Sequence, residues 1–295
     1  MIRLIIAFIL FSGLHGNLMP LHGYASDGLV HVEGGTYQFE EYRIEMTRAT
    51  TVGDFYIGKY PVTWGEWARV RAWALGNGYN FGQRLFLSGE MGCDDEHPVD
   101  QVTWYMAVIW CNALSEMEGL DPAYYADTEH TTVYRGEDRI DLTQHHVDWE
   151  SNGYRLPTEA EWRFAALGGN RSRGYPYSGS QDPNDVAWYR ANSHDAECGD
   201  LRIYGGRGTW PVGQKSPNEL GIYDMNGNVH EWCWDWHDFL DFDEVTEPKG
   251  PDQGRRKVVT GGNFASRDFE LLLARRVSAR PNSGAGFRLV RSSVD

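Results

Sequence analysis

The stretch GYRLPTEAEWRFAALGG, residues 153–169, carries the clearest structural signal of this 295-residue chain. Thr158 is followed three residues later by Glu161, the spacing of a capping box, in which each side chain accepts a hydrogen bond from the other residue's backbone N–H. The helix after this start has an apolar face, formed by Trp162, Ala165 and Ala166. Gly168 is the kind of residue that ends a helix. The stretch therefore predicts a short helix with one buried side.

Two further helices are predicted upstream. Thr63 and Glu66 repeat the capping box, and the helix that they begin runs to Gly76. Its expected apolar face consists of Trp67, Val70 and Leu75. A second helix begins at Thr103 and ends near Gly119, with apolar residues at helical spacing. These residues are Ala107, Trp110, Cys111 and Leu114.

The rest of the chain predicts short strands and ordered loops. Residues 29–60 alternate between apolar and polar and contain turn signals, a pattern typical of short strands. Residues 121–153 and 170–220 lack sustained periodicity and are rich in Gly, Pro, Asp and Asn. Their aromatic residues argue against disorder. With 41% hydrophobic residues and no visible linker or repeat, we expect one domain over residues 26–295.

The first 25 residues resemble a secretory leader. Arg3 supplies the positive start, and Leu4–Phe11 form an apolar run too short to span a bilayer. The alternative is a buried N-terminal segment. No later run is long and apolar enough to cross a membrane. We therefore expect an exported protein, at the cell surface or in the periplasmic or extracellular space. The net charge of −15 argues against nucleic acid and polybasic membrane binding.

Four cysteines follow the predicted leader: Cys93, Cys111, Cys198 and Cys233. In an exported chain they allow three different two-bridge connectivities. No two stand at C-x-x-C spacing, which argues against a zinc knuckle. Cys111 falls on the apolar side of a predicted helix, where a small buried thiol is expected. The sequence HDAEC, residues 194–198, contains metal-ligand types, but we interpret it as a polar loop.

Four motifs in a fixed order resemble the formylglycine-generating enzyme, or sulfatase-modifying factor, family. They are HPVDQVTWYMAVIWCNALSEMEGL, GYRLPTEAEWRFAALGG, PVGQKSPNELGIYDMNGNVHEWCWDW and GFRLV, at residues 97–120, 153–169, 211–236 and 286–290. The resemblance covers residues 29–291. It implies an α+β, loop-rich C-type lectin-like fold with small antiparallel sheets and a few helices, which agrees with the predicted short elements.

The resemblance also implies where copper chemistry would be located. Family members that oxidise a sulfatase cysteine carry two cysteines after a Gly-Gly pair, and their thiolates hold copper. Counted from Gly262, the two positions are Ser266 and Leu271 in this chain. Neither residue can replace a thiolate. We therefore expect no copper and no catalytic residue.

Residues 261–291, the C-terminal segment, are also similar to variable proteins of diversity-generating retroelements, of the treponemal surface-protein type. The shared order is a Gly-Gly pair, a first run, a framework stretch, a second run, a proline and Gly-Phe-Arg-Leu-Val. In this chain these parts are Gly261-Gly262, residues 265–270, residues 271–276, residues 277–280, Pro281 and residues 286–290. The resemblance implies a diversified surface on a constant scaffold.

The two runs contain the planar cations, aromatic ring and hydroxyl that are common in binding surfaces. The expected ligand-binding residues are Ala265, Ser266, Arg267, Phe269, Glu270, Val277, Ser278, Ala279 and Arg280. The expected partner is a protein or glycan on another cell surface. Two alternatives stay open: the segment is an ordinary surface loop, or the protein is a formylglycine-family enzyme or accessory protein with a non-copper activity.

The family resemblance implies a structural calcium ion in the loop of residues 224–231, here the Asp224 loop. The family ligands are two side chains and two backbone carbonyls, which correspond to Asp224, Glu231, Gly227 and Val229. Several oxygen atoms on a flexible turn suit calcium. The alternative is that Asp224 caps a turn and Glu231 pairs with an arginine.

Overall fold

The computed structural model describes residues 28–41, 46–82, 94–136, 140–194, 206–239 and 243–293. The expected leader, Cys93 and Cys198 lie outside these ranges. The described helices are α2 (Trp64–Gly76), α3 (Trp104–Met117), α4 (Glu159–Ala166) and α5 (Pro183–Val186). Short 3₁₀ turns are η2 (Gln144–His146), η3 (Gly169–Arg171) and η4 (Asp268–Glu270). No helix of the described residues has the length and apolar character needed to cross a membrane.

Twelve short strands complete the described secondary structure. The first six are β1 (Leu29–Val32), β2 (Gly35–Glu41), β3 (Met46–Val52), β4 (Phe55–Gly58), β5 (Tyr154–Arg155) and β6 (Ala187–Trp188). The others are β7 (Asn226–Gly227), β8 (Glu231–Trp236), β9 (Val245–Thr246), β10 (Lys257–Thr260), β11 (Val277–Ala279) and β12 (Val290–Ser292). The predicted α+β composition, with few helices and small sheets, is confirmed.

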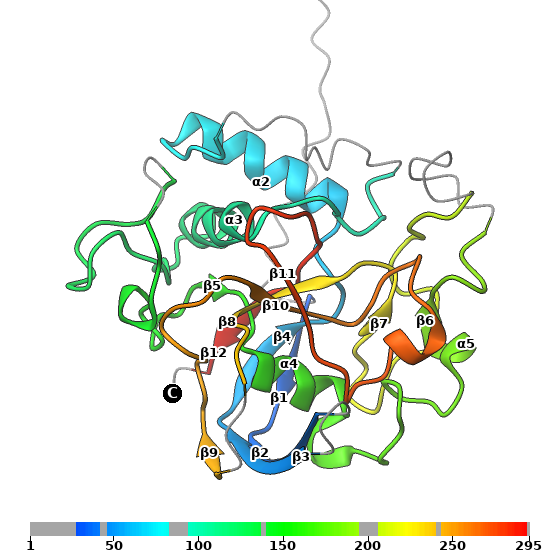
Figure 1. Ribbon diagram of the computed structural model, residues 1–295. Helices are drawn as coiled ribbons and strands as arrows, with labels where there is room; N and C mark the ends of the chain where they lie inside the picture. The colour runs from blue at the N-terminus through cyan, green and yellow to red at the C-terminus, as the bar shows by residue number, and fades with distance from the viewer. Residues whose placement is uncertain are drawn as a thin grey trace, which may run out of the picture.

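The strands form four small sheets. Their orders are β1-β4-β12-β5, β11-β10-β8, β2-β3-β9 and β6-β7. In the first sheet β4 lies between strands from the two ends of the chain. Most pairs are antiparallel, as expected, but β3–β9 and β6–β7 are parallel. Figure 1 shows α2 and α3 together on one side of the strands and α4 among the strands on the other side.

The three predicted capping starts are confirmed. The hydroxyls of Thr63, Thr103 and Thr158 each accept a backbone hydrogen bond, and the first and third residues form complete capping boxes. Trp162, Ala165 and Ala166 are buried, as predicted. Leu75 was wrongly expected on the buried face of α2, since its side chain is 53% exposed. Ala74 takes that place, because it lies one helical turn after the buried Val70.

Two large apolar clusters hold the elements together. The larger lies between α2 and α3 and includes Trp67, Trp110 and Phe287. The Trp67 and Trp110 rings stack at a centroid distance of 6.2 Å, and the Phe287 ring meets both edge-on. The second cluster packs α4, through Trp162 and neighbouring residues, against the strands near the N-terminus. Because Phe287 is buried, the end of the C-terminal segment belongs to the core.

Candidate functional site

The C-terminal segment begins with two glycines in a conformation that favours glycine. Gly261 and Gly262 have φ angles of +81° and +73°. A Cβ on Gly262 would lie 2.5 Å from Cδ2 of Leu271. The Gly261 carbonyl accepts a hydrogen bond from the Gly227 N–H at 2.8 Å. The segment is therefore anchored to the Asp224 loop at its start.

The first run, residues 265–270, splits into exposed and inward side chains. The exposed ones are Arg267, Asp268 and Phe269, while Ala265 and Glu270 are half-buried. Ser266 lies inward, although we expected it among the ligand-binding residues. Its buried hydroxyl accepts from the Asn263 N–H at 3.0 Å and donates to the Asn263 side-chain oxygen at 3.1 Å. The first run thus presents mainly Arg267 and Phe269, with Asp268 between them.

The framework stretch, residues 271–276, turns into the protein. Leu271 and Leu273 are buried. Arg276 is also buried and forms a two-pronged pair with Glu159 on α4, at 2.8 Å (Nε–Oε1) and 2.7 Å (Nη2–Oε2). Burial alone raises the pKa of the Glu159 carboxyl, but the guanidinium groups of Arg276 and Arg163 hold it below its ordinary value.

A second arginine fastens the framework backbone. Arg163, also on α4, donates from Nη1 to the Leu273 carbonyl and from Nη2 to the Arg275 carbonyl at 3.1 Å. Its Nε also contacts Glu159 at 3.2 Å. These contacts of Arg163 with the framework backbone were not predicted from the sequence. The available signal was Glu159 and Arg163, two charged residues four apart in a helix expected to be largely buried.

The second run, residues 277–280, follows the framework as β11 and Arg280. Val277, Ser278 and Ala279 are half-buried, and Arg280 is exposed. Val277 and Ala279 pack against the larger apolar cluster. Arg256 donates from Nε to the Ser278 hydroxyl at 3.0 Å. In Figure 1 the orange turn with η4 lies beside β6 and β7, whereas β11 lies over β10 near the middle of the view.

The two positions that correspond to copper-binding cysteines in the family hold no metal ligand. Ser266 is bonded within its own turn, as described above. Leu271 packs in a small apolar cluster, formed with Tyr177, Val186, Ala187 and Tyr189. The described cysteines, Cys111 and Cys233, are buried and unbridged, and burial raises the pKa of both thiols. A buried neutral thiol is a poor metal ligand.

Asp224 has one carboxylate oxygen available for a further bond. Its Oδ2 accepts from the Gly213 N–H at 2.7 Å, while Oδ1 is buried without a hydrogen-bond partner. Burial raises the pKa of the Asp224 carboxyl to about 6. An unpaired buried carboxylate oxygen is costly unless a cation or a donor satisfies it. This feature fits a calcium ligand.

Glu231 fits a calcium ion less well. Both its carboxylate oxygens are bonded to Arg288, at 2.6 Å (Nε–Oε2) and 2.7 Å (Nη2–Oε1), and Trp162 donates to Oε2 at 2.7 Å. The arginine-pairing alternative therefore describes this side chain. Gly227 and Val229 are buried on the same loop. No cluster of three or more His, Cys, Asp or Glu suited to a metal occurs among the described residues. The charge available to a cation is that of Asp224.

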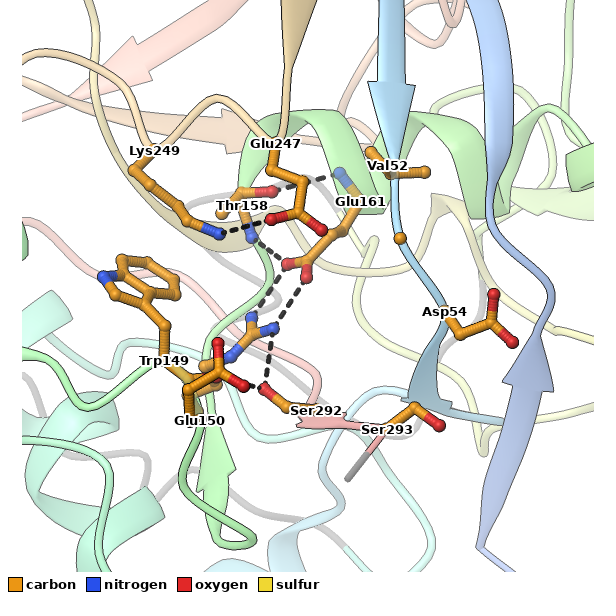
Figure 2. A pocket seen from close by; sticks show the side chains of 12 residues that line it. Val52, Asp54, Trp149, Glu150, Thr158, Glu161, Glu247, Lys249, Ser292 and Ser293 are labelled. Carbon is orange, nitrogen blue, oxygen red and sulfur yellow. Dashed lines mark hydrogen bonds and ion pairs between the residues drawn. The ribbon is translucent and has the colours of Figure 1, made fainter. Parts of the chain in front are cut away.

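A pocket of about 440 Å³ lies at a different place, between β3, β5, α4 and β12. Figure 2 shows Lys249 and Glu247 pointing toward each other, whereas Asp54 lies apart from them. Arg155 binds Glu161 at 2.7 Å, and the Lys249 ammonium lies 3.9 Å from Glu247. The same ammonium sits 4.4 Å from the centroid of the Trp149 ring. Both basic side chains of the pocket are thus paired with carboxylates.

The comparisons with known proteins agree on one family. The model of the sulfatase-modifying factor enzyme 1-like domain matches residues 18–293. Chaperone protein LppX of Paenibacillus barcinonensis is 42% identical over 248 residues, which cover 82% of this chain and 80% of that protein. The formylglycine-generating enzyme of Thermomonospora curvata is 27% identical over 301 residues, covering 91% and 93%. The solved structure of Treponema denticola variable protein 1 has a TM-score of 0.69 and 29% identity, and the match covers 89% of this chain and 94% of that one.

Proposed function

The chain belongs to the sulfatase-modifying factor enzyme 1-like family and has its lectin-like α+β fold, and from this premise we propose that it is a non-catalytic binding protein. The binding surface is formed by the exposed side chains of the first and second runs. One observation carries the proposal: Arg267, Phe269 and Arg280 are exposed on a backbone that is fixed by buried residues. A side chain on ordered backbone loses little entropy on binding, which favours affinity.

The residues at the family's reactive positions support the non-catalytic part. Oxygen chemistry with copper needs two thiolates, and Ser266 and Leu271 supply none. Leu271 instead fills an apolar cluster that holds the first run in place. A position that serves as a metal ligand in the enzymes thus serves packing here.

We propose that the partner is a protein outside the cytoplasm. The likeness to a protein named as a chaperone favours a protein over a glycan. The likeness to a variable protein supports a binding role for the C-terminal face. Exposed arginine and aromatic side chains are the residue types that most often dominate protein–protein affinity. The expected leader supports export.

The test replaces Arg267, Phe269 and Arg280 by alanine together. Ser278 stays unchanged because its hydroxyl is held by Arg256. We expect the melting temperature to be retained, since exposed substitutions cost within about 0.5 kcal/mol. Binding to extracted surface proteins, measured by surface plasmon resonance, is expected to weaken by about thirtyfold, which corresponds to about 2 kcal/mol.

The matched control replaces the exposed Arg69 and Leu75 on α2, again a cation and an apolar side chain, by alanine. This variant is expected to bind like the unmodified protein. Unchanged binding in the triple variant, or equal loss in the α2 control, would show that the partner is held elsewhere.

We further propose one structural calcium ion at the Asp224 loop. Asp224, with its open Oδ1, would be the principal side-chain ligand, and the carbonyls of Gly227 and Val229 would supply further oxygen atoms. The ion would hold the turn from which the Gly227 N–H reaches Gly261. It has no part in a reaction.

A further inference from the structure

β2 is the edge strand of its sheet in the described part of the chain. The orientation of the backbone N–H and C=O groups of β2 follows from that of β3. The Thr51 carbonyl on β3 accepts a hydrogen bond from the Glu247 N–H, next to β9, at 2.8 Å, so it points away from β2. Backbone groups of alternate residues in a strand point the same way. The backbone N–H and C=O groups of Ala49 and Thr47 therefore also point away from β2. Those of their partners, Gln38 and Glu40, point away from β3. The N–H groups of Gln38 and Glu40 face the free edge.

A groove of about 410 Å³ runs along this edge. One wall is β2, where Gln38 and Glu40 are exposed. The opposite wall belongs to two other segments, residues 174–176 and the framework stretch. It is mainly apolar, with Tyr175, Pro176 and Leu272 half-buried along it. The edge of β2 thus faces an apolar wall across the groove. Figure 1 shows β2 at the lower end of the molecule.

Arg163 joins the two walls at the base of the groove. From Nη1 it donates to the Glu40 carbonyl on β2 at 3.3 Å and to the Leu273 carbonyl on the other wall. Arg163 is 3% exposed, and its guanidinium is held by Glu159. The walls are therefore fixed relative to each other. The groove does not need to be assembled by its ligand.

We propose that an extended segment of a partner protein occupies this groove and adds to β2 as a further strand. Its backbone would pair with the N–H and C=O of Gln38 and the N–H of Glu40. An apolar side chain of the segment would pack on Leu272 and Pro176. A basic side chain would lie beside Glu40, which is the exposed charge among the lining residues, since the Arg163 charge is paired with Glu159.

This surface is separate from the exposed side chains of the two runs. The framework stretch lines the groove and connects the two runs along the chain. The proposal therefore goes beyond the proposed function, and its failure leaves the proposed function intact.

The decisive substitution is Gln38→Pro, with Gln38→Ala as its matched control. Proline removes the N–H that faces the groove but no hydrogen bond to β3, and it is tolerated on edge strands. Alanine removes the same side chain and keeps the N–H. The probe is a fluorescein-labelled decapeptide of alternating valine and lysine, titrated by fluorescence anisotropy. We expect about tenfold weaker binding for Gln38→Pro than for Gln38→Ala. Equal binding by the two variants would overturn the proposal.

Glu40→Lys provides a test that does not depend on the folding of the proline variant. It should weaken binding of the valine–lysine peptide and strengthen binding of the corresponding valine–glutamate peptide. No change in this preference would contradict the assigned position of the basic side chain. If the unmodified protein forms a dimer that Gln38→Pro dissociates, the occupant is a second copy of this chain and the proposal of a foreign partner is wrong. The triple variant in the two runs should bind the peptide unchanged.

Discussion

At the scale of single residues, the arginines of the C-terminal segment serve two different purposes. Arg276 is buried and shares the Glu159 carboxylate with Arg163. Arg267 and Arg280 are exposed. A buried guanidinium must be paired to offset its loss of solvation, whereas an exposed one stays hydrated and free to contact a partner. The same residue type thus both fixes the backbone and forms the proposed binding surface.

This difference predicts the effect of two matched substitutions. Arg276→Met should lower the free energy of unfolding by about 3–5 kcal/mol, because Glu159 then keeps a buried charge with one partner fewer. Arg280→Met should change it by about 0.5 kcal/mol or less. Urea unfolding followed by tryptophan fluorescence measures both. Equal effects would mean that the pair with Glu159 does not hold the framework stretch.

At the scale of elements, α4 connects the N-terminal strands to the C-terminal segment. Its eight residues are all buried, including Glu159, Glu161 and Arg163. Charged residues are rarely buried on every face of a helix unless each is paired. Here Glu161 pairs with Arg155, and Glu159 pairs with Arg163 and Arg276. The helix therefore combines paired charges with apolar side chains that belong to the second cluster.

A helix of eight residues depends on its first turn, which gives a prediction for the capping box. Thr158→Ala removes the hydroxyl that accepts from the Glu161 N–H at 3.1 Å. We expect a loss of about 1 kcal/mol in the free energy of unfolding. Thr128→Ala, at an exposed threonine outside any helix, is the control and should be close to neutral. The same loss in both variants would show that capping does not stabilise α4.

At the scale of the whole molecule, distant parts of the chain close around a few loops. β4 lies between β1 and β12, so the two ends of the described chain share one sheet. The Asp224 loop connects to Trp188 through the Asn228 N–H at 2.7 Å and to Gly261 through the Gly227 N–H. Stabilising this loop is therefore expected to stabilise the protein as a unit.

The proposed calcium ion is expected to affect the stability of the whole protein. Chelation should lower the melting temperature, and added calcium should restore it. With free calcium about a hundredfold above its dissociation constant, binding adds about 2.7 kcal/mol to stability. Asp224→Ala should abolish the response, whereas Asp268→Ala, at an exposed carboxylate, should preserve it. If chelation has no effect on the unmodified protein, or if Asp224→Ala still responds to calcium, Asp224 does not bind the ion.

Features that depend on residues close together in the chain could be predicted from the amino-acid sequence. The helix starts at Thr63, Thr103 and Thr158 follow from side chains that reach backbone groups three residues away. Three successive leucines, residues 271–273, do not by themselves show which side chains turn inward. The error at Leu75 shows the limit of this reasoning. Near the end of a helix, adjacent residues such as Ala74 and Leu75 face different sides, so an error of one position exchanges a buried residue for an exposed one.

The contacts between groups far apart in the chain could not be predicted in this way, because they depend on the folded arrangement. Glu159 and Arg276 are 117 positions apart, and Glu231 and Arg288 are 57 apart. Ser266 was expected at the surface but turns inward, because Asn263 and the left-handed glycines before it curl the chain. The groove beside β2 has walls from three separate segments. Such contacts depend on the packing of the whole chain, since a buried charge finds its partner through the fold and not through its neighbours in sequence.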